Sequence, residues 1–112
     1  MPGTDFDVRV DETDEVATLR MSGDVNRGAQ EGLEQAYSGT NAGSVVLDFS
    51  DVDYINSTGI AVIVGLLAKA RAAGKDMRAF GLTDHYRQIF QITRIADFMA
   101  IYDDEHTAVA AG

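Results

Sequence analysis

Residues 44–74 constrain the fold of this chain more than any other segment. They begin with Ser44-Val45-Val46-Leu47-Asp48-Phe49, a β-rich run bounded by turn residues, which is typical of a buried central strand. A turn written DVDYINSTG follows, and residues 60–73 then have the pattern of a helix that Gly74 closes. A buried strand that leads through a short turn into a helix favours an α/β domain.

The flanking sequence extends this alternation of strands and helices. Residues 6–10 and 16–21 are predicted to form a hairpin, and Ser22-Gly23-Asp24 is predicted to end its second strand. Asn26 is expected to cap a helix that reaches about Tyr37. Further elements are predicted as a strand over 77–80, a helix capped by Thr83 or Asp84, a strand over 98–102 and a helix over 105–111. The order β-β-α-β-α-β-α-β-α predicts a mixed central β-sheet with helices packed on it.

Composition narrows the class of protein. A chain of 112 residues predicts a single domain over residues 1–112. The absence of cysteine excludes disulfides and thiolate metal sites. A net charge of −9 disfavours nucleic acid and anionic membranes as partners. No signal peptide or membrane-spanning run is recognised, so we expect a cytoplasmic, monomeric domain without cofactor or metal.

The chemistry of the chain is expected where the turn meets the helix. Asn56, Ser57 and Thr58 are all residue types that cap helices, and Gly59 allows close approach of backbone and partner. A helix N-terminus presents free backbone N–H groups and the positive end of the helix dipole, which stabilise an oxyanion or a phosphate. The alternative interpretation is that these four residues only cap the helix.

The segment VVLDFSDVDYINSTGIAVIVGLL resembles the signature of STAS domains, specifically of the anti-sigma factor antagonists. In that family a strand and an acid-containing turn lead to Asp-Ser-Ser/Thr-Gly, which opens a helix. Residues 21–26 are similar to the Gly-Glu-Leu-Asp segment of the family, and residues 86–98 to its late helix and the following turn. The resemblance covers nearly the whole chain and implies a STAS-like domain.

The resemblance also implies a function, that of a regulatory switch. Ser57 matches the serine that an anti-sigma factor with serine kinase activity phosphorylates, and Thr58 matches a secondary hydroxyl. The unphosphorylated antagonist captures the anti-sigma factor and releases the sigma factor, as in a stress response. The phosphorylated form lets go, and a serine phosphatase that acts on phospho-Ser57 would reset the switch.

A partner surface is predicted around this serine. Ile60, Ile63, Val64 and Leu67 form the stripe expected to face the sheet, which leaves Val62 and Leu66 as additional apolar side chains. These two either contact a partner or are covered by neighbouring elements. Substitution of Gly59 by valine is expected to weaken binding more than folding. The predicted partner-binding residues are Asn26, Asn56, Ser57, Thr58, Gly59, Val62 and Leu66.

Three positions depart from the family pattern. Asn56 and Asn26 stand where the family has acids, and Arg94 stands where a small residue is frequent. The two asparagines still cap helices, but they remove carboxylates near Ser57. This change either impairs recognition by the kinase or makes a phosphate easier to accommodate.

Two other classes of function are considered. One is a STAS subunit of a larger assembly, such as a lipid-transport complex or a stress-signalling scaffold, without phosphate turnover. The other is an enzyme with Ser57 as nucleophile, which is disfavoured because I-N-S-T-G lacks the G-x-S-x-G pattern. His85 and His106 are expected to be solvated, Asp48, Asp51 and Asp53 to lie at loop edges, and Asp103-Asp104-Glu105 to begin the last helix.

Overall fold

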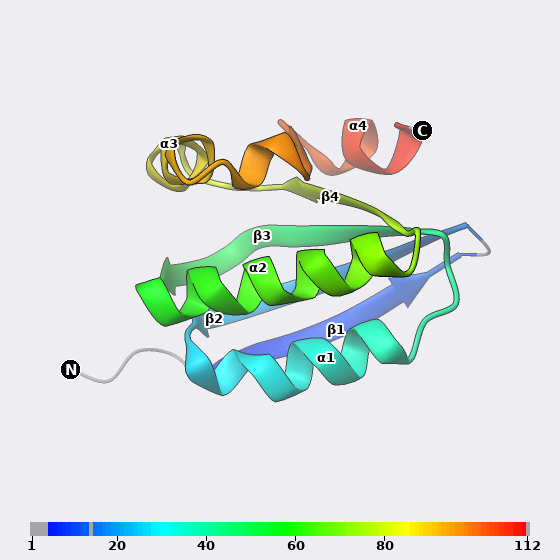
Figure 1. The fold of residues 1–112 in the computed structure, drawn as a ribbon, viewed down its shortest axis with the longest axis horizontal. Coiled ribbons are helices and arrows are strands. Elements are labelled where there is room, and N and C mark those ends of the chain that lie inside the picture. Colours follow the sequence, from blue (N-terminus) through cyan, green and yellow to red (C-terminus); the bar gives the residue numbers. More distant parts are fainter. Residues whose placement is uncertain (1–4, 14, 112) are drawn as a thin grey trace.

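The elements of the fold follow the predicted order of strands and helices. The structure is a computed structural model that describes residues 5–13 and 15–111. In that part of the chain it contains five strands, four α-helices and two 3-10 helices (Figure 1). Their bounds are β1 (Asp7–Glu12), β2 (Val16–Val25), η1 (Arg27–Ala29), α1 (Gln30–Ser38), β3 (Ser44–Ile55), α2 (Ser57–Ala72), β4 (Asp76–Phe80), α3 (Asp84–Ile92), η2 (Ile95–Asp97), β5 (Ala100–Tyr102) and α4 (Glu105–Ala110).

The sheet is mixed, and its strands lie side by side in sequence order from β1 to β5. The strands β1 and β2 form the predicted antiparallel hairpin, with Val8 opposite Met21. The remaining neighbours are parallel, and α1, α2 and α3 make the connections between them. The prediction of a mixed sheet with packed helices is therefore confirmed.

Two predicted strand ends are wrong, and both concern the same pair of strands. Ser22-Gly23-Asp24 does not end β2, which continues to Val25. Residues 51–55, the first part of the predicted turn, instead continue β3 to Ile55. These polar extensions pair with each other, with Val25 opposite Ile55, and two register shifts absorb the irregular fit. Each extension satisfies the backbone groups of the other, a tertiary effect that composition does not reveal.

Alternating side chains divide the core between the two faces of the sheet. Leu19 and Leu47 belong to the larger core, which the side chains of α1, α2 and α3 complete. Val46 and Phe80 point the other way and pack with Ala108 of α4. Helices α1 and α2 run along the strands on one face (Figure 1), and α4 covers part of the opposite face.

Charged side chains hold α4 on its face of the sheet. Arg20 donates to Asp48 at 3.1 Å and to Glu105 of α4 at 2.6 Å, and it also pairs with Asp11. Hydrogen bonds to Glu105 and Asp11 raise the pKa of the Arg20 guanidinium above its ordinary value. Asp48 is therefore buried in an ionic cluster, and the expectation that it lies at a loop edge is wrong.

The buried stripe of α2 differs from the predicted one by a rotation of the helix. The helix begins at Ser57, three residues earlier than predicted, and buries Gly59, Ile63, Leu66, Leu67 and Ala70. Ile63 and Leu67 are thus confirmed as core residues, whereas Val64 is 45% exposed. The stripe starts at Gly59, because this glycine approaches the sheet closely. A glycine adds nothing to the hydropathy pattern, so the pattern predicts that the stripe starts at Ile60, one residue after its observed start.

The remaining boundaries differ in small ways. Asn26 caps the 3-10 helix η1, and α1 follows it directly. The last strand begins at Ala100, because Phe98 ends η2 and is 52% exposed. Thr83, one of the two predicted caps, accepts from the backbone N–H of Tyr86 at 3.3 Å.

Candidate functional site

The predicted turn between strand and helix is a tight junction in which Asn56 is the single residue between β3 and α2. The Asn56 side-chain oxygen accepts from the backbone N–H of Gly59 at 2.7 Å, and its carbonyl accepts from Ile60 at 2.9 Å. Asn56 is therefore the N-cap of α2. The N–H groups of the first helical residues have no carbonyl partner within a helix. Ser57, the first helical residue, is exposed, and Thr58 is half-buried.

The junction is anchored on the end of β2. The backbone N–H of Asn56 donates to the carbonyl oxygen of Val25 at 3.3 Å. A Cβ atom on Gly59 would lie 1.9 Å from the same oxygen and 3.2 Å from Ile55 Cγ2. Gly59 is consequently buried and serves the packing of α2 on the sheet. The prediction that Gly59 lies on the partner surface is wrong, because the residue is buried, and the clash of a Cβ with β2 leads us to expect that Gly59→Val impairs folding.

The two asparagines that depart from the family pattern lie at adjacent strand ends. Val25 pairs with Ile55, so Asn26 and Asn56 follow neighbouring strands at the same edge of the sheet. Asn26 accepts from the backbone N–H of Gly28 at 2.8 Å and caps η1, which packs against α2. Both asparagines therefore act as caps beside Ser57, and neither brings a charge to it.

The surface next to Ser57 is a face of α2 composed of small residues. Helical spacing places Ser57 on one side with four further exposed residues, Ala61, Val64, Gly65 and Ala68. Leu66 is buried and Val62 packs against the core, so the prediction of a partner surface on Leu66 is wrong and Val62 is mostly covered. The small residues that α2 carries between its core positions indicate this exposed face, and the hydropathy pattern gave them no weight.

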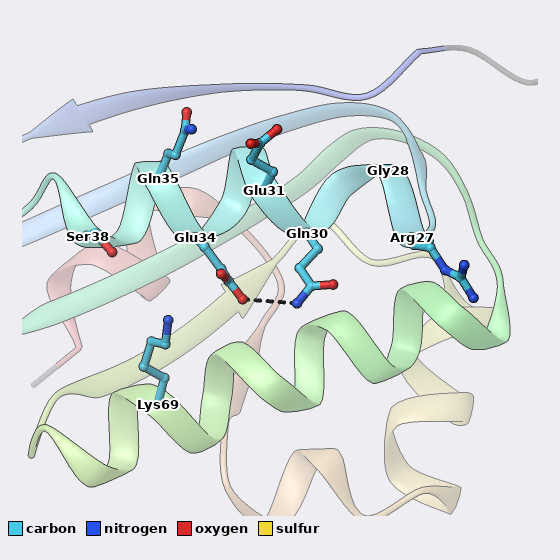
Figure 2. A pocket seen from close by; sticks show the side chains of 8 residues that line it. All are labelled: Arg27, Gly28, Gln30, Glu31, Glu34, Gln35, Ser38 and Lys69. Atoms are coloured by element: carbon cyan, nitrogen blue, oxygen red, sulfur yellow. Dashed lines mark hydrogen bonds between the residues drawn. The ribbon is translucent and has the colours of Figure 1, made fainter.

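A polar groove of about 600 Å³ runs between α1 and α2 (Figure 2). Figure 2 shows Arg27 towards one end and Lys69 reaching from α2 towards α1 at the other, while Gln30 donates to Glu34 at 3.2 Å. The groove therefore mixes both signs of charge. Its lining residues are Arg27, Gly28, Gln30, Glu31, Glu34, Gln35, Ser38 and Lys69.

The other candidate side chains do not gather into a site. His85 and His106 are both exposed, as predicted, and they lie on α3 and α4, which cover opposite faces of the sheet. Asp104 caps α4 as the predicted start of the last helix. Within residues 5–13 and 15–111, no group of three or more His, Cys, Asp or Glu side chains could hold a metal ion.

Comparison with known proteins gives the family. A family model described as "Mlab, STAS domain" matches residues 8–101, which is most of the chain. The chain belongs to the STAS domain family. An anti-sigma-B factor antagonist of Listeria monocytogenes is 34% identical over 59 residues, which are 53% of this chain and 52% of the relative. This STAS domain thus matches the curated relative over about half of the length of that protein.

Solved structures agree with the fold of this STAS domain. An anti-sigma factor antagonist from Mycobacterium paratuberculosis has a TM-score of 0.78 at 18% identity, covering 96% of this chain and 93% of that one. The anti-sigma factor antagonist SpoIIAA in its unphosphorylated form has a TM-score of 0.71 at 17% identity, covering 92% and 93%. The phosphorylated form of Bacillus SpoIIAA has a TM-score of 0.68 at 15% identity, covering 92% and 96%.

The third departure from the STAS pattern has a visible structural consequence. Arg94 has φ 69° and ψ 11°, the left-handed conformation that a glycine adopts more easily. Its guanidinium donates to Asp97 at 2.5 Å across η2.

None of the helices formed by the described residues of this STAS domain is both long and apolar enough to span a membrane.

Proposed function

We propose that this STAS domain is a monomeric, cytoplasmic anti-sigma factor antagonist formed by residues 1–112. Its partner would be an anti-sigma factor with serine kinase activity, which phosphorylates Ser57. The observation that carries the proposal is the position of Ser57: it is exposed as the first residue of α2 and shares a helix face with small residues. The anti-sigma-B factor antagonist of Listeria monocytogenes and the phosphorylated form of SpoIIAA support the assignment.

The geometry favours Ser57 over Thr58 as the phosphate acceptor. A kinase must reach the hydroxyl from solvent, and Ser57 is exposed whereas Thr58 is half-buried. A phosphate on Ser57 would lie at the N-terminus of α2, where the helix dipole stabilises an anion by about 0.3–1 kcal/mol at an exposed position. Asn26 and Asn56 add no negative charge there. Phosphorylation should therefore leave the fold intact.

The effect of the phosphate would then be exerted at the interface. The exposed residues Ala61, Val64 and Ala68 carry short apolar side chains on one face of α2, on which a partner can pack closely. A phosphate of charge about −1.5 to −2 at the edge of such a surface must be desolvated when the partner docks. A penalty of about 3 kcal/mol weakens binding more than a hundredfold. The domain itself would perform no catalysis in this mechanism.

The test combines phosphosite mapping with binding. The domain is incubated with the cognate anti-sigma factor and ATP, and the modified residue is identified by mass spectrometry; Ser57→Ala should abolish labelling, and Thr58→Ala should retain it. Calorimetric titration should show that Ser57→Asp binds at least a hundredfold more weakly than the wild type. Ser57→Asn is the matched control, because it has the shape of aspartate without its charge and should lose much less. Equal affinities for the aspartate and asparagine variants would contradict the proposal.

A second candidate rests on the two asparagines. Because Asn26 and Asn56 remove the family acids beside Ser57, the same surface could dock a partner in a larger assembly, such as a lipid-transport complex or a stress-signalling scaffold, without phosphate turnover. Failure of the anti-sigma factor to label Ser57, together with binding that is insensitive to Ser57→Asp, would favour this candidate.

The phosphorylation switch proposed first also requires a serine phosphatase that acts on phospho-Ser57 and resets it.

A further inference from the structure

The tyrosine of α3 contacts the strand that delivers Ser57. The backbone N–H of Ile55 donates to the hydroxyl oxygen of Tyr86 at 3.0 Å, and the two residues are 31 positions apart in the sequence. Ile55 immediately precedes the cap Asn56 and is buried. This hydrogen bond therefore connects α3 to the backbone two residues before the exposed serine.

The topology of the sheet explains why this contact is needed. Within the described residues, β4 pairs with β3 along Ser44–Asp48 and no further. On its other side the extension of β3 pairs with β2, where Val25 faces Ile55. The N–H of Ile55 is therefore directed to the side that β4 has left, and a buried N–H without a partner costs free energy. Tyr86 supplies the acceptor that a longer β4 would have provided.

The first turn of α3, which carries Tyr86, is held in place at two points. The chain turns out of β4 at Gly81, which has φ 85° and would place a Cβ 2.6 Å from the backbone nitrogen of Ser50 in β3. Thr83 then caps α3 by accepting from the N–H of Tyr86. The first turn of α3 is thus tied to β3 at one point and oriented by its own cap at another.

We propose that Tyr86 is a positioning residue for the Ser57 junction. By holding the N–H of Ile55, it fixes the backbone from which Asn56 caps α2 and from which Ser57 projects towards a partner. In this arrangement α3 controls the geometry of the acceptor hydroxyl without contacting the partner surface of α2. The kinetic part of the inference rests on the proposed function, whereas its structural part does not.

The variant Tyr86→Phe isolates this role, because it keeps the ring and removes the acceptor. A cavity of about 30 Å³ that both Ile55 and Tyr86 line lies between β3 and residues 81–83, and it has room for a water molecule. Water can therefore satisfy the N–H of Ile55 in the variant, so global unfolding should change little. The matched control is Tyr54→Phe, which removes a hydroxyl from the neighbouring residue of β3, where the side chain is 55% exposed.

Amide hydrogen exchange followed by NMR is the first measurement. Tyr86→Phe should accelerate exchange at Ile55 at least tenfold and shift the amide resonances of Ser57 and Thr58, while Tyr54→Phe should leave both unchanged. Unaltered exchange at Ile55, or altered exchange with unmoved Ser57 and Thr58 resonances, would overturn the inference. This experiment requires no partner, so it decides the structural claim even if the proposed function fails.

Phosphorylation kinetics is the second measurement. With the cognate anti-sigma kinase, Tyr86→Phe should lower kcat for Ser57 at least fivefold with KM within twofold of the wild type, because the docking face of α2 is untouched. A raised KM with unchanged kcat would overturn the positioning role. If the kinase fails to label the wild type as well, the proposed function is refuted, and the exchange experiment decides the inference by itself.

Discussion

Substitution of Gly59 by alanine gives the sharpest test of how α2 is seated. The added Cβ would lie 1.9 Å from the carbonyl oxygen of Val25 and 2.6 Å from its carbonyl carbon, whereas ordinary contacts begin at 3.4 Å. Both atoms belong to the backbone of β2, so no side-chain rotation can relieve the clash. The first turn of α2 and the end of β2 must therefore separate by about 1.5 Å.

The free energy of this separation can be worked out from the contacts that it disturbs. Overpacking of a well-packed position costs about 1–3 kcal/mol. The hydrogen bond from the Asn56 N–H to the Val25 carbonyl, already 3.3 Å long, contributes a further loss of about 0.5–1.5 kcal/mol. Alanine recovers about 0.5–1 kcal/mol relative to glycine inside a helix. The net result should be a loss of about 2 kcal/mol, which lowers the melting temperature by about 10 °C in a domain of this size.

Urea unfolding followed by circular dichroism measures this loss directly, and Gly65→Ala is the matched control. Gly65 lies in the same helix, is exposed, and has nothing within 4 Å of an added Cβ. That variant should gain about 0.5–1 kcal/mol from helix propensity alone. If Gly59→Ala unfolds at the same urea concentration as Gly65→Ala, the close approach of α2 to β2 does not exist and the reasoning is refuted.

Three further predictions concern stability. Arg94→Gly should raise the free energy of unfolding by about 0.5–1 kcal/mol by removing the left-handed strain at φ 69°, and Arg94→Ala should not; equal urea midpoints for the two variants would contradict this. Tyr37→Phe should stabilise the domain by about 1 kcal/mol, because the buried Tyr37 hydroxyl has no hydrogen-bond partner in the described part of the chain; a lower melting temperature would count against it. The backbone N–H and the hydroxyl of Thr107 donate to Asp104 and lower its pKa below its ordinary value. Asp104 therefore stabilises the fold above its unfolded pKa, and this contribution is lost as the pH falls through the folded value. Asp104→Asn, which caps without titrating, should unfold with a shallower pH dependence than the wild type as the pH falls below about 3.9, the ordinary pKa of an aspartate, and parallel curves would refute the assignment.

Much of the fold could be predicted because its signals are local. The buried run that begins at Ser44, the cap at Asn26 and the closing Gly74 each act within a few residues. The predictions fail where contacts with residues distant in the sequence determine the local structure. Residues 51–55 form a strand because Ser22 to Val25 pairs with them, and the buried stripe of α2 follows from the contact between Gly59 and Val25.

The candidate site shows the same division. Ser57 could be singled out from its position in a capping sequence, and the structure leaves it exposed. The surface beside Ser57 could not be predicted in the same way. Hydropathy singles out Leu66 as a contact residue, but Leu66 is buried, whereas Ala61 and Ala68 are exposed. The contact of Tyr86 with Ile55 was equally out of reach, because it depends on where β4 ends relative to β3.

The two asparagines show why capping and charge have to be considered separately at this site. Asn26 and Asn56 each accept a hydrogen bond from a backbone N–H, at 2.8 Å and 2.7 Å, and an aspartate would accept the same bonds. The capping geometry of the junction is therefore expected to be insensitive to the exchange of acid for amide. The electrostatics of the junction do depend on this exchange, since two carboxylates at adjacent strand ends would repel a phosphate on Ser57. For the proposed phosphorylation of Ser57, the two substitutions thus leave the capping geometry in place and remove two negative charges from the neighbourhood of the phosphate.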